Sequence, residues 1–237
     1  MSAASPWASG LSVARWCVYL VAGLVPVAAS YYPGFSDTAL PLTYDQYVVV
    51  KFALVLALAG VGLGAWLVTA ATEGVVLRRV PAVEYAVGAL LVWASVSTLL
   101  SVHRPTAVLG AYARYEGLVS FFAYAVVAFL ALQVLDSPKR LRECALVLVA
   151  SGSLVAVYGL LQSLGVLAAP QGTLPFEAER AFSTFGNPTM LGVFLLMPLA
   201  LALALALTEG GRRLRAVFWL AFSVCGAALL LTFTRAA

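Results

Sequence analysis

The candidate functional residues of this chain include three arginines that lie between apolar runs and could bind an anion. Arg104 and Arg114 precede an apolar run that begins at Gly117, and Arg180 precedes another that begins at Thr189. A guanidinium is a planar fork that bonds two phosphate oxygens at once. The pattern therefore predicts an anion-binding rim, and the structural alternative is a belt of Arg and Tyr side chains at the membrane surface.

Segment 101–117 contains the first two of these arginines. We expect Arg104, Arg114 and Glu116 to cluster there, at the ends of two consecutive helices. His103, the only histidine, has no His, Cys or carboxylate partner at metal-ligand spacing, so we expect no metal site, and we also expect no cofactor. His103 is interpreted as a solvated surface residue, and a role as a lone general base is the alternative.

Segment 186–188, Gly-Asn-Pro, is typical of a turn that leads into a helix. Asn187 or Thr189 is placed to cap that helix, whose N-terminus would offer free backbone N–H groups and a partial positive charge to an anion. Together with Arg180, eight residues before the proline, this turn predicts a phosphate or diphosphate site. The alternative is a capped turn in which Arg180 pairs with a glutamate of segment 177–179.

The composition restricts the class of protein to which these segments belong. Of the 237 residues, 63% are hydrophobic and 10% are charged, and the mean hydropathy is +0.99. Soluble domains have about 25% charged residues and disordered chains have low hydrophobicity, so both classes are excluded. Three cysteines in a chain of this length also exclude a disulfide scaffold. A polytopic membrane protein remains.

Seven apolar runs are long enough to be membrane-spanning helices, because a span needs about 20 residues and backbone polar groups in lipid must be bonded internally. The fold class is therefore all-α, a polytopic helical bundle, which we expect to be one transmembrane domain over residues 1–237. The Gly60/Gly64 pair in the second run predicts close helix packing. The runs are Val13–Ser30, Val48–Thr72, Val83–Ser101, Gly117–Leu135, Leu141–Leu167, Thr189–Thr208 and Arg215–Thr234.

The distribution of basic residues predicts the orientation of these spans. One set of ends and loops carries nine basic residues and the other carries five. The positive-inside rule places the richer set, and with it the N-terminus, in the cytoplasm. Loops 31–47, 102–116 and 168–188 would then face outward. The first run is interpreted as a retained anchor, with a cleaved signal peptide as the alternative.

Three segments resemble the O-antigen ligase and polymerase superfamily of bacterial inner-membrane proteins. Segment 110–117, Gly-Ala-Tyr-Ala-Arg-Tyr-Glu-Gly, is similar to a Gly-x-x-x-Arg-Tyr-Glu-Gly segment of that family. Segment 180–188 is similar to its Arg-x-x-Gly/Ser-Thr-Phe-Gly-Asn-Pro entry into a helix, and segment 231–237 to its Thr-x-Ser/Thr-Arg-Gly/Ala-Ala segment. The order of the three segments also agrees.

The resemblance implies a multi-pass glycosyltransferase of the GT-C type. Such proteins take a glycan from an undecaprenyl-diphosphate carrier at the periplasmic face and pass it to lipid A–core or to another lipid or glycolipid acceptor. Arg180 and Arg235 match the arginines that contact the donor diphosphate. The partners implied are this donor, its acceptor and membrane lipids, with no nucleic acid.

The same resemblance implies that the chain is the N-terminal portion of a longer protein. The family's proposed base is a histidine in a large periplasmic loop beyond the position of Ala237, and His103 does not match it. We therefore expect this portion to be inactive by itself. The second hypothesis is a transporter or flippase for a lipid-linked or anionic solute, although the spans show no repeated halves.

Overall fold

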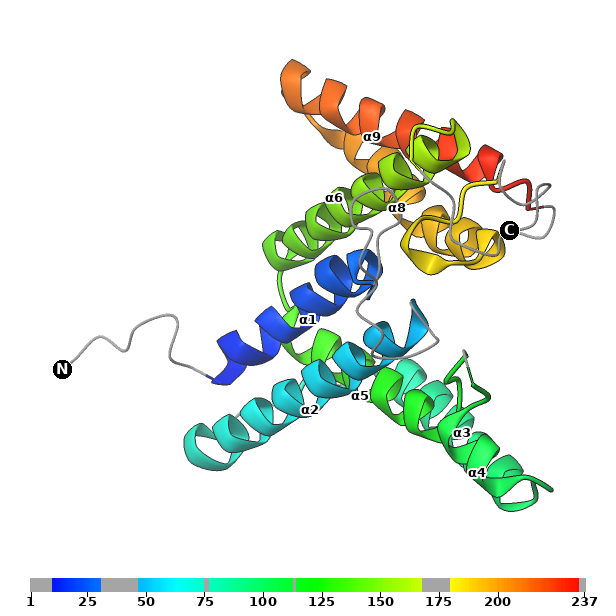
Figure 1. The fold of residues 1–237 in the computed structure, drawn as a ribbon. Helices are drawn as coiled ribbons and strands as arrows, with labels where there is room; N and C mark the ends of the chain where they lie inside the picture. Colours follow the sequence, from blue (N-terminus) through cyan, green and yellow to red (C-terminus); the bar gives the residue numbers. More distant parts are fainter. Residues whose placement is uncertain (1–9, 31–46, 75–76, 113, 168–179, 235–237) are drawn as a thin grey trace. The chain divides into compact units, whose positions relative to one another are not determined.

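The computed structural model describes residues 10–30, 47–74, 77–112, 114–167 and 180–234. Within these ranges the chain forms eight α-helices and one short 3-10 helix (Figure 1). The fold is therefore all-α, as predicted. The α-helices are α1 (Gly10–Val27), α2 (Val48–Glu73), α3 (Pro81–Leu99), α4 (Arg104–Leu109), α5 (Leu118–Val134), α6 (Pro138–Ser163), α8 (Pro188–Thr208) and α9 (Arg212–Leu231), and the 3-10 helix is η1 (Ser183–Phe185).

Six of these helices are long and apolar enough to cross a membrane: α1, α2, α3, α6, α8 and α9. The remaining run of the sequence forms α5, an apolar helix of 17 residues. At 1.5 Å per residue α5 is about 26 Å long, at the short end of the range for a span. Every predicted run thus coincides with a helix, and the chain is a multi-pass helical bundle.

Helix α6 begins three residues before the apolar run that predicted it. Arg140 N donates to Ser137 Oγ at 3.4 Å and Leu141 N donates to Ser137 O at 3.0 Å, so the helix starts at Pro138. Lys139 and Arg140 therefore lie in its first turn. A run of high hydropathy identifies only the part of a helix that can lie in lipid. The hydrogen bonds that begin the helix are made at its polar end, before that run.

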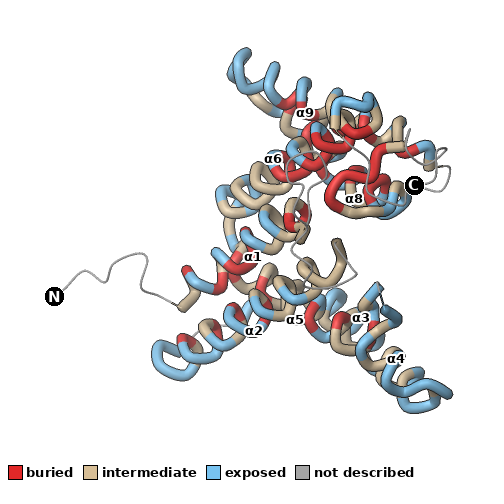
Figure 2. Tube along the Cα trace, viewed as in Figure 1, coloured by how far each residue is buried: buried red, intermediate tan, exposed pale blue. Residues whose placement is uncertain are grey.

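The contacts divide the chain into two compact units, which are described separately. The first comprises Met1–Val21 and Lys51–Leu141, and the second comprises Ala22–Val50 and Arg142–Ala237. Figure 2 shows buried residues in short stretches of the helices, with exposed residues along most of α3. The core of the first unit contains Ala14, Val18, Trp66, Leu130 and Val134, and the core of the second contains Val155, Ala156, Ala181, Leu191, Leu195, Cys225 and Ala228.

Glycine allows close helix packing in the first unit, but at a different position from the predicted pair. A Cβ added at Gly62 would lie 2.7 Å from Leu130 Cδ1 and 3.2 Å from Cys17 Cβ. A Cβ added at Gly60 or Gly64 would meet nothing within 4 Å among the described residues. The prediction for Gly60 and Gly64 is therefore wrong for these contacts, because the face of α2 that carries both is exposed.

The second unit compensates for a proline within a helix. Pro26 has no N–H, so the carbonyl of Ala22, four residues earlier, loses its intrahelical partner. Ser151 Oγ of α6 donates to this carbonyl at 3.1 Å. A neighbouring hydroxyl thus satisfies the freed group, which is how proline is tolerated in spanning helices.

Candidate functional site

The segment 110–117 of the first unit is a closed loop whose two terminal glycines touch. A Cβ at Gly117 would lie 2.3 Å from Gly110 N and 2.4 Å from Val108 O, and a Cβ at Gly110 would lie 2.4 Å from Glu116 N. Gly110 also has a φ of +91°. Any side chain at either position would force the backbone apart, so the loop requires glycine at both ends.

Tyr115 is fixed inside this loop in a left-handed conformation, with a φ of +51°. Its ring stacks on Phe52 with the centroids 5.5 Å apart, and Ser120 Oγ donates a hydrogen bond to its carbonyl. A bulky residue with positive φ is uncommon because its Cβ is crowded by the backbone. The stacking and the hydrogen bond hold the residue there.

The structure leaves the three charged residues of this region exposed. Arg114 and Glu116 lie on the closed loop itself. Arg104 begins α4, and the loop closes at the other end of that helix, about 9 Å along its axis. Among the described residues no ion pair joins these side chains. Arg114 and Glu116 thus share one loop, and α4 separates Arg104 from it. His103 precedes α4, exposed, without a side-chain capping bond.

In the second unit Arg180 lies against the C-terminus of α9. Its Nε donates to Thr232 O at 2.8 Å, and Ala181 N donates to Leu231 O at 3.0 Å. Two of the resembled segments, 180–188 and 231–237, are therefore bonded to each other. Glu177 and Glu179, the alternative partners of Arg180, lie outside the described residues, as does Arg235.

Two side chains of segment 180–188 anchor it to the surrounding helices. Thr184 Oγ1 donates to Pro26 O at 2.6 Å, and Ser183 Oγ donates to Val155 O at 2.6 Å. Gln162, at the end of α6, accepts a hydrogen bond from Ser183 N at 2.7 Å through Oε1. Gln162 could not be singled out by sequence reasoning, because a single amide in an apolar run has no distinguishing pattern.

The turn before α8 forms as predicted, and Asn187 is the residue that caps the helix. Its Oδ1 accepts hydrogen bonds from Thr189 N at 2.8 Å and Met190 N at 3.4 Å. Pro188 has no N–H, and Leu191 N already donates to Asn187 O at 3.0 Å. The prediction of free backbone N–H groups at this helix start is therefore wrong, since the cap occupies them.

Each resembled segment contains one non-glycine residue with a positive φ. These residues are Tyr115 at +51°, Ser183 at +53° and Phe233 at +49°, and they are the only ones among the described residues. Conformations of this kind cost free energy and concentrate at functional sites. The three segments singled out by sequence are thus also the places where the backbone departs from its ordinary conformations.

An apolar pocket of about 250 Å³ borders the anchored segment. Thr184 contributes to its wall, and the rest comes from Val27 and from α6 residues between Leu154 and Leu161. Within the described residues no group of three His, Cys, Asp or Glu side chains is arranged to hold a metal ion. The groups here that could bind a ligand are therefore one arginine and several hydroxyl and amide groups, next to an apolar pocket.

Comparisons of the chain with protein-family models, with curated proteins and with solved structures find no match. The resemblance to the O-antigen ligase superfamily therefore rests on its three segments.

Proposed function

We propose that this chain belongs to a membrane glycosyltransferase of the O-antigen ligase type. It takes a glycan from an undecaprenyl-diphosphate carrier at the outer face of the bacterial inner membrane, with lipid A–core or another glycolipid as the acceptor. The observation that carries the proposal is the bond between Arg180 and Thr232 O, which joins two of the three resembled segments.

This bond prepares Arg180 to bind a phosphate. It occupies Nε and fixes the plane of the guanidinium, and no other bond of this side chain is found among the described residues. The two Nη groups then form the edge that matches a pair of phosphate oxygens. Because negative charge develops on the diphosphate as the glycosyl bond breaks, a fixed cation there stabilises the transition state.

The surroundings of Arg180 suit a lipid-linked donor. The carrier places an apolar chain directly beside its diphosphate, and the pocket against Thr184 and Val27 is apolar and lies in the same unit. The anchoring of Ser183 and Thr184 limits how far the segment between the pocket and α8 can move. Asn187, which we also assign to substrate binding, caps α8 through its Oδ1, and this cap does not use its Nδ2, the group that we direct to a ligand.

The test is the affinity of the full chain, in lipid nanodiscs, for undecaprenyl diphosphate. Arg180→Lys keeps the positive charge but loses the planar fork, so we expect the affinity to fall about tenfold. Arg142→Lys is the matched control. Arg142 belongs to the same unit and pairs with Glu209 at 2.6 Å, away from the three segments.

Equal affinities for the unaltered chain and Arg180→Lys would contradict the donor-binding role. The transporter hypothesis is tested separately in proteoliposomes with a labelled lipid-linked glycan and a glycolipid acceptor. Label that crosses the bilayer without reaching the acceptor would favour the transporter hypothesis.

A further inference from the structure

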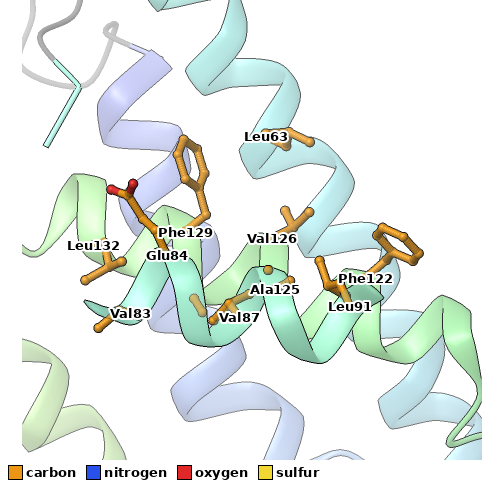
Figure 3. A pocket seen from close by; sticks show the side chains of 12 residues that line it. Leu63, Val83, Glu84, Val87, Leu91, Phe122, Ala125, Val126, Phe129 and Leu132 are labelled. Atoms are coloured by element: carbon orange, nitrogen blue, oxygen red, sulfur yellow. The ribbon is translucent and has the colours of Figure 1, made fainter. Parts of the chain in front are cut away.

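A groove in the first unit lies outside the site proposed above. It has a volume of about 370 Å³ and runs between α2, α3 and α5 (Figure 3). Leu63 of α2, Leu91 of α3 and Phe122 of α5 are among its apolar walls, and Glu84 is its one charged lining residue. From Val83 to Leu91 it extends about 12 Å along α3.

One end of this groove is polar and the other is apolar. Glu84 comes from the first turn of α3 and lies at the same end as Leu132 of α5, whereas Leu91 and Phe122 line the opposite end (Figure 3). The groove therefore has the polarity of a lipid molecule that lies parallel to the helices.

The polar end is built by the loop between α2 and α3. Arg78 and Gln133 exchange two hydrogen bonds, in which Arg78 N donates to Oε1 at 3.0 Å and Nε2 donates to Arg78 O at 2.9 Å. Arg78 Nη1 also donates to Leu135 O at 3.2 Å. These bonds fix the loop against the end of α5, next to Leu132 of the groove.

Arg79 is held beside the mouth of the groove by Glu84. Its Nε lies 3.5 Å from Glu84 Oε2, and Glu84 Oε1 accepts a hydrogen bond from Val80 N at 2.9 Å. The carboxylate charge is thus compensated, while the Arg79 side chain stays 71% exposed. A guanidinium has five N–H donors, so most of those of Arg79 are available to a phosphate.

Cations exceed anions at this end of the unit. The contact of Arg78 with Leu135 brings the start of α6 to the same end, with Lys139, Arg140 and Asp136. Among the described residues, Arg78, Arg79, Lys139 and Arg140 are four cations, and the acidic residues of the same helix ends are three: Glu84, Asp136 and Glu73 at the end of α2.

We propose that this groove binds one anionic phospholipid of the bilayer. An acyl chain lies between α3 and α5, and the phosphate is bound by Arg79 with Arg78 beside it. The excess of cations selects a lipid with net negative charge, because a zwitterionic headgroup would bring its ammonium among the arginines. Basic pockets between spanning helices recognise anionic headgroups in this way.

The test is native mass spectrometry of the full chain, released from detergent that contains phosphatidylglycerol and phosphatidylcholine with identical acyl chains. We expect the chain to retain one phosphatidylglycerol about fivefold more often than one phosphatidylcholine. In Arg79→Gln this preference falls by about fivefold, while retention of phosphatidylcholine is unchanged.

Glycines provide a matched pair for testing the groove itself. Gly88 lines the groove, and a Cβ added there meets nothing within 4 Å. Gly88→Leu therefore adds a side chain whose Cβ meets no atom, and by occupying the groove it should abolish retention of both lipids. Gly64 is an exposed glycine of α2 with equally open surroundings and does not line the groove, so Gly64→Leu should retain lipid as the unaltered chain does.

A second filling variant, Ala125→Leu from the α5 wall, guards against a folding defect in the first. Equal retention of the two lipids by the unaltered chain would overturn the proposal. So would normal retention in both filling variants, or an unchanged preference in Arg79→Gln. A dimer that is lost in Gly88→Leu would assign the groove to a second copy of the chain and would also overturn it.

Discussion

Arg180 Nε donates to Thr232 O across 52 residues of sequence, at 2.8 Å. Thr232 is the C-cap of α9, directly after its last residue Leu231, and is fully buried. The last carbonyls of a helix have no intrahelical partner, and a cation there also interacts favourably with the helix dipole. Arg180 therefore completes the C-terminus of α9 and is itself oriented by it.

Removing this arginine should destabilise the second unit. Arg180→Ala leaves the Thr232 carbonyl without its charged donor, at an expected cost of about 1–3 kcal/mol in the free energy of unfolding. Denaturation of the detergent-solubilised chain, followed by tryptophan fluorescence, measures this loss. Arg213→Ala is the control, because Arg213 is exposed in the first turn of α9, where a cation gains nothing from the dipole. Equal effects of the two substitutions would refute the capping role.

The hydroxyl of Thr184 should matter in the same unit. Thr184 is 2% exposed and donates to Pro26 O in the last turn of α1. Thr184→Val keeps the shape but leaves that buried carbonyl without this donor, so we expect a loss of about 1–3 kcal/mol in unfolding experiments. Thr208→Val, at an exposed hydroxyl that bonds Ala204 O, should change the stability by less than about 0.5 kcal/mol. A loss of stability in Thr208→Val as large as that in Thr184→Val would show that burial does not determine how much a threonine hydroxyl contributes to stability.

The spans were predictable because their signal is local. An apolar run of about 20 residues has no other stable conformation in lipid, and each run coincides with a helix. Helix α4 was not predicted, since Arg104–Leu109 is too short to show a periodicity. The cap at Asn187 was among the predictions because Asn-Pro at a helix start is a local pattern as well.

The contacts of the site were not predictable from spacing. Arg180 meets Thr232, and Ser183 meets Gln162, only because helices distant in sequence pack together. Local charge suggested Glu177 or Glu179 as an alternative partner of Arg180, and both glutamates lie outside the described residues. Likewise, the spacing of Gly60 and Gly64 indicates small residues on one face of α2, but not whether another helix lies against that face.

Gly186 should tolerate no side chain, for two separable reasons. Its φ is +63°, and a Cβ there would lie 2.3 Å from Cδ2 of the Tyr47 ring. We expect Gly186→Ala to cost about 2–4 kcal/mol, from backbone strain and overpacking together. In a Tyr47→Ala background only the strain remains, and the cost should fall to about 1–2 kcal/mol. A double-mutant cycle of unfolding free energies measures the difference. If the changes in unfolding free energy from the two substitutions were strictly additive, the Tyr47 ring would not restrict a side chain at position 186.

The closed loop at 110–117 should depend on its glycines more than any exposed helical glycine does. In Gly117→Ala the new methyl meets Gly110 N and Val108 O, which are backbone atoms and cannot rotate away. The loop must open, at a cost of at least about 1–3 kcal/mol. Gly60→Ala, by contrast, places the same methyl in open space in a helix interior and should stabilise the chain by about 0.5–1 kcal/mol. Thermal unfolding of the two variants in one detergent compares them directly. If both shifted the midpoint in the same direction, the contact between the two loop glycines would not be what holds the loop closed.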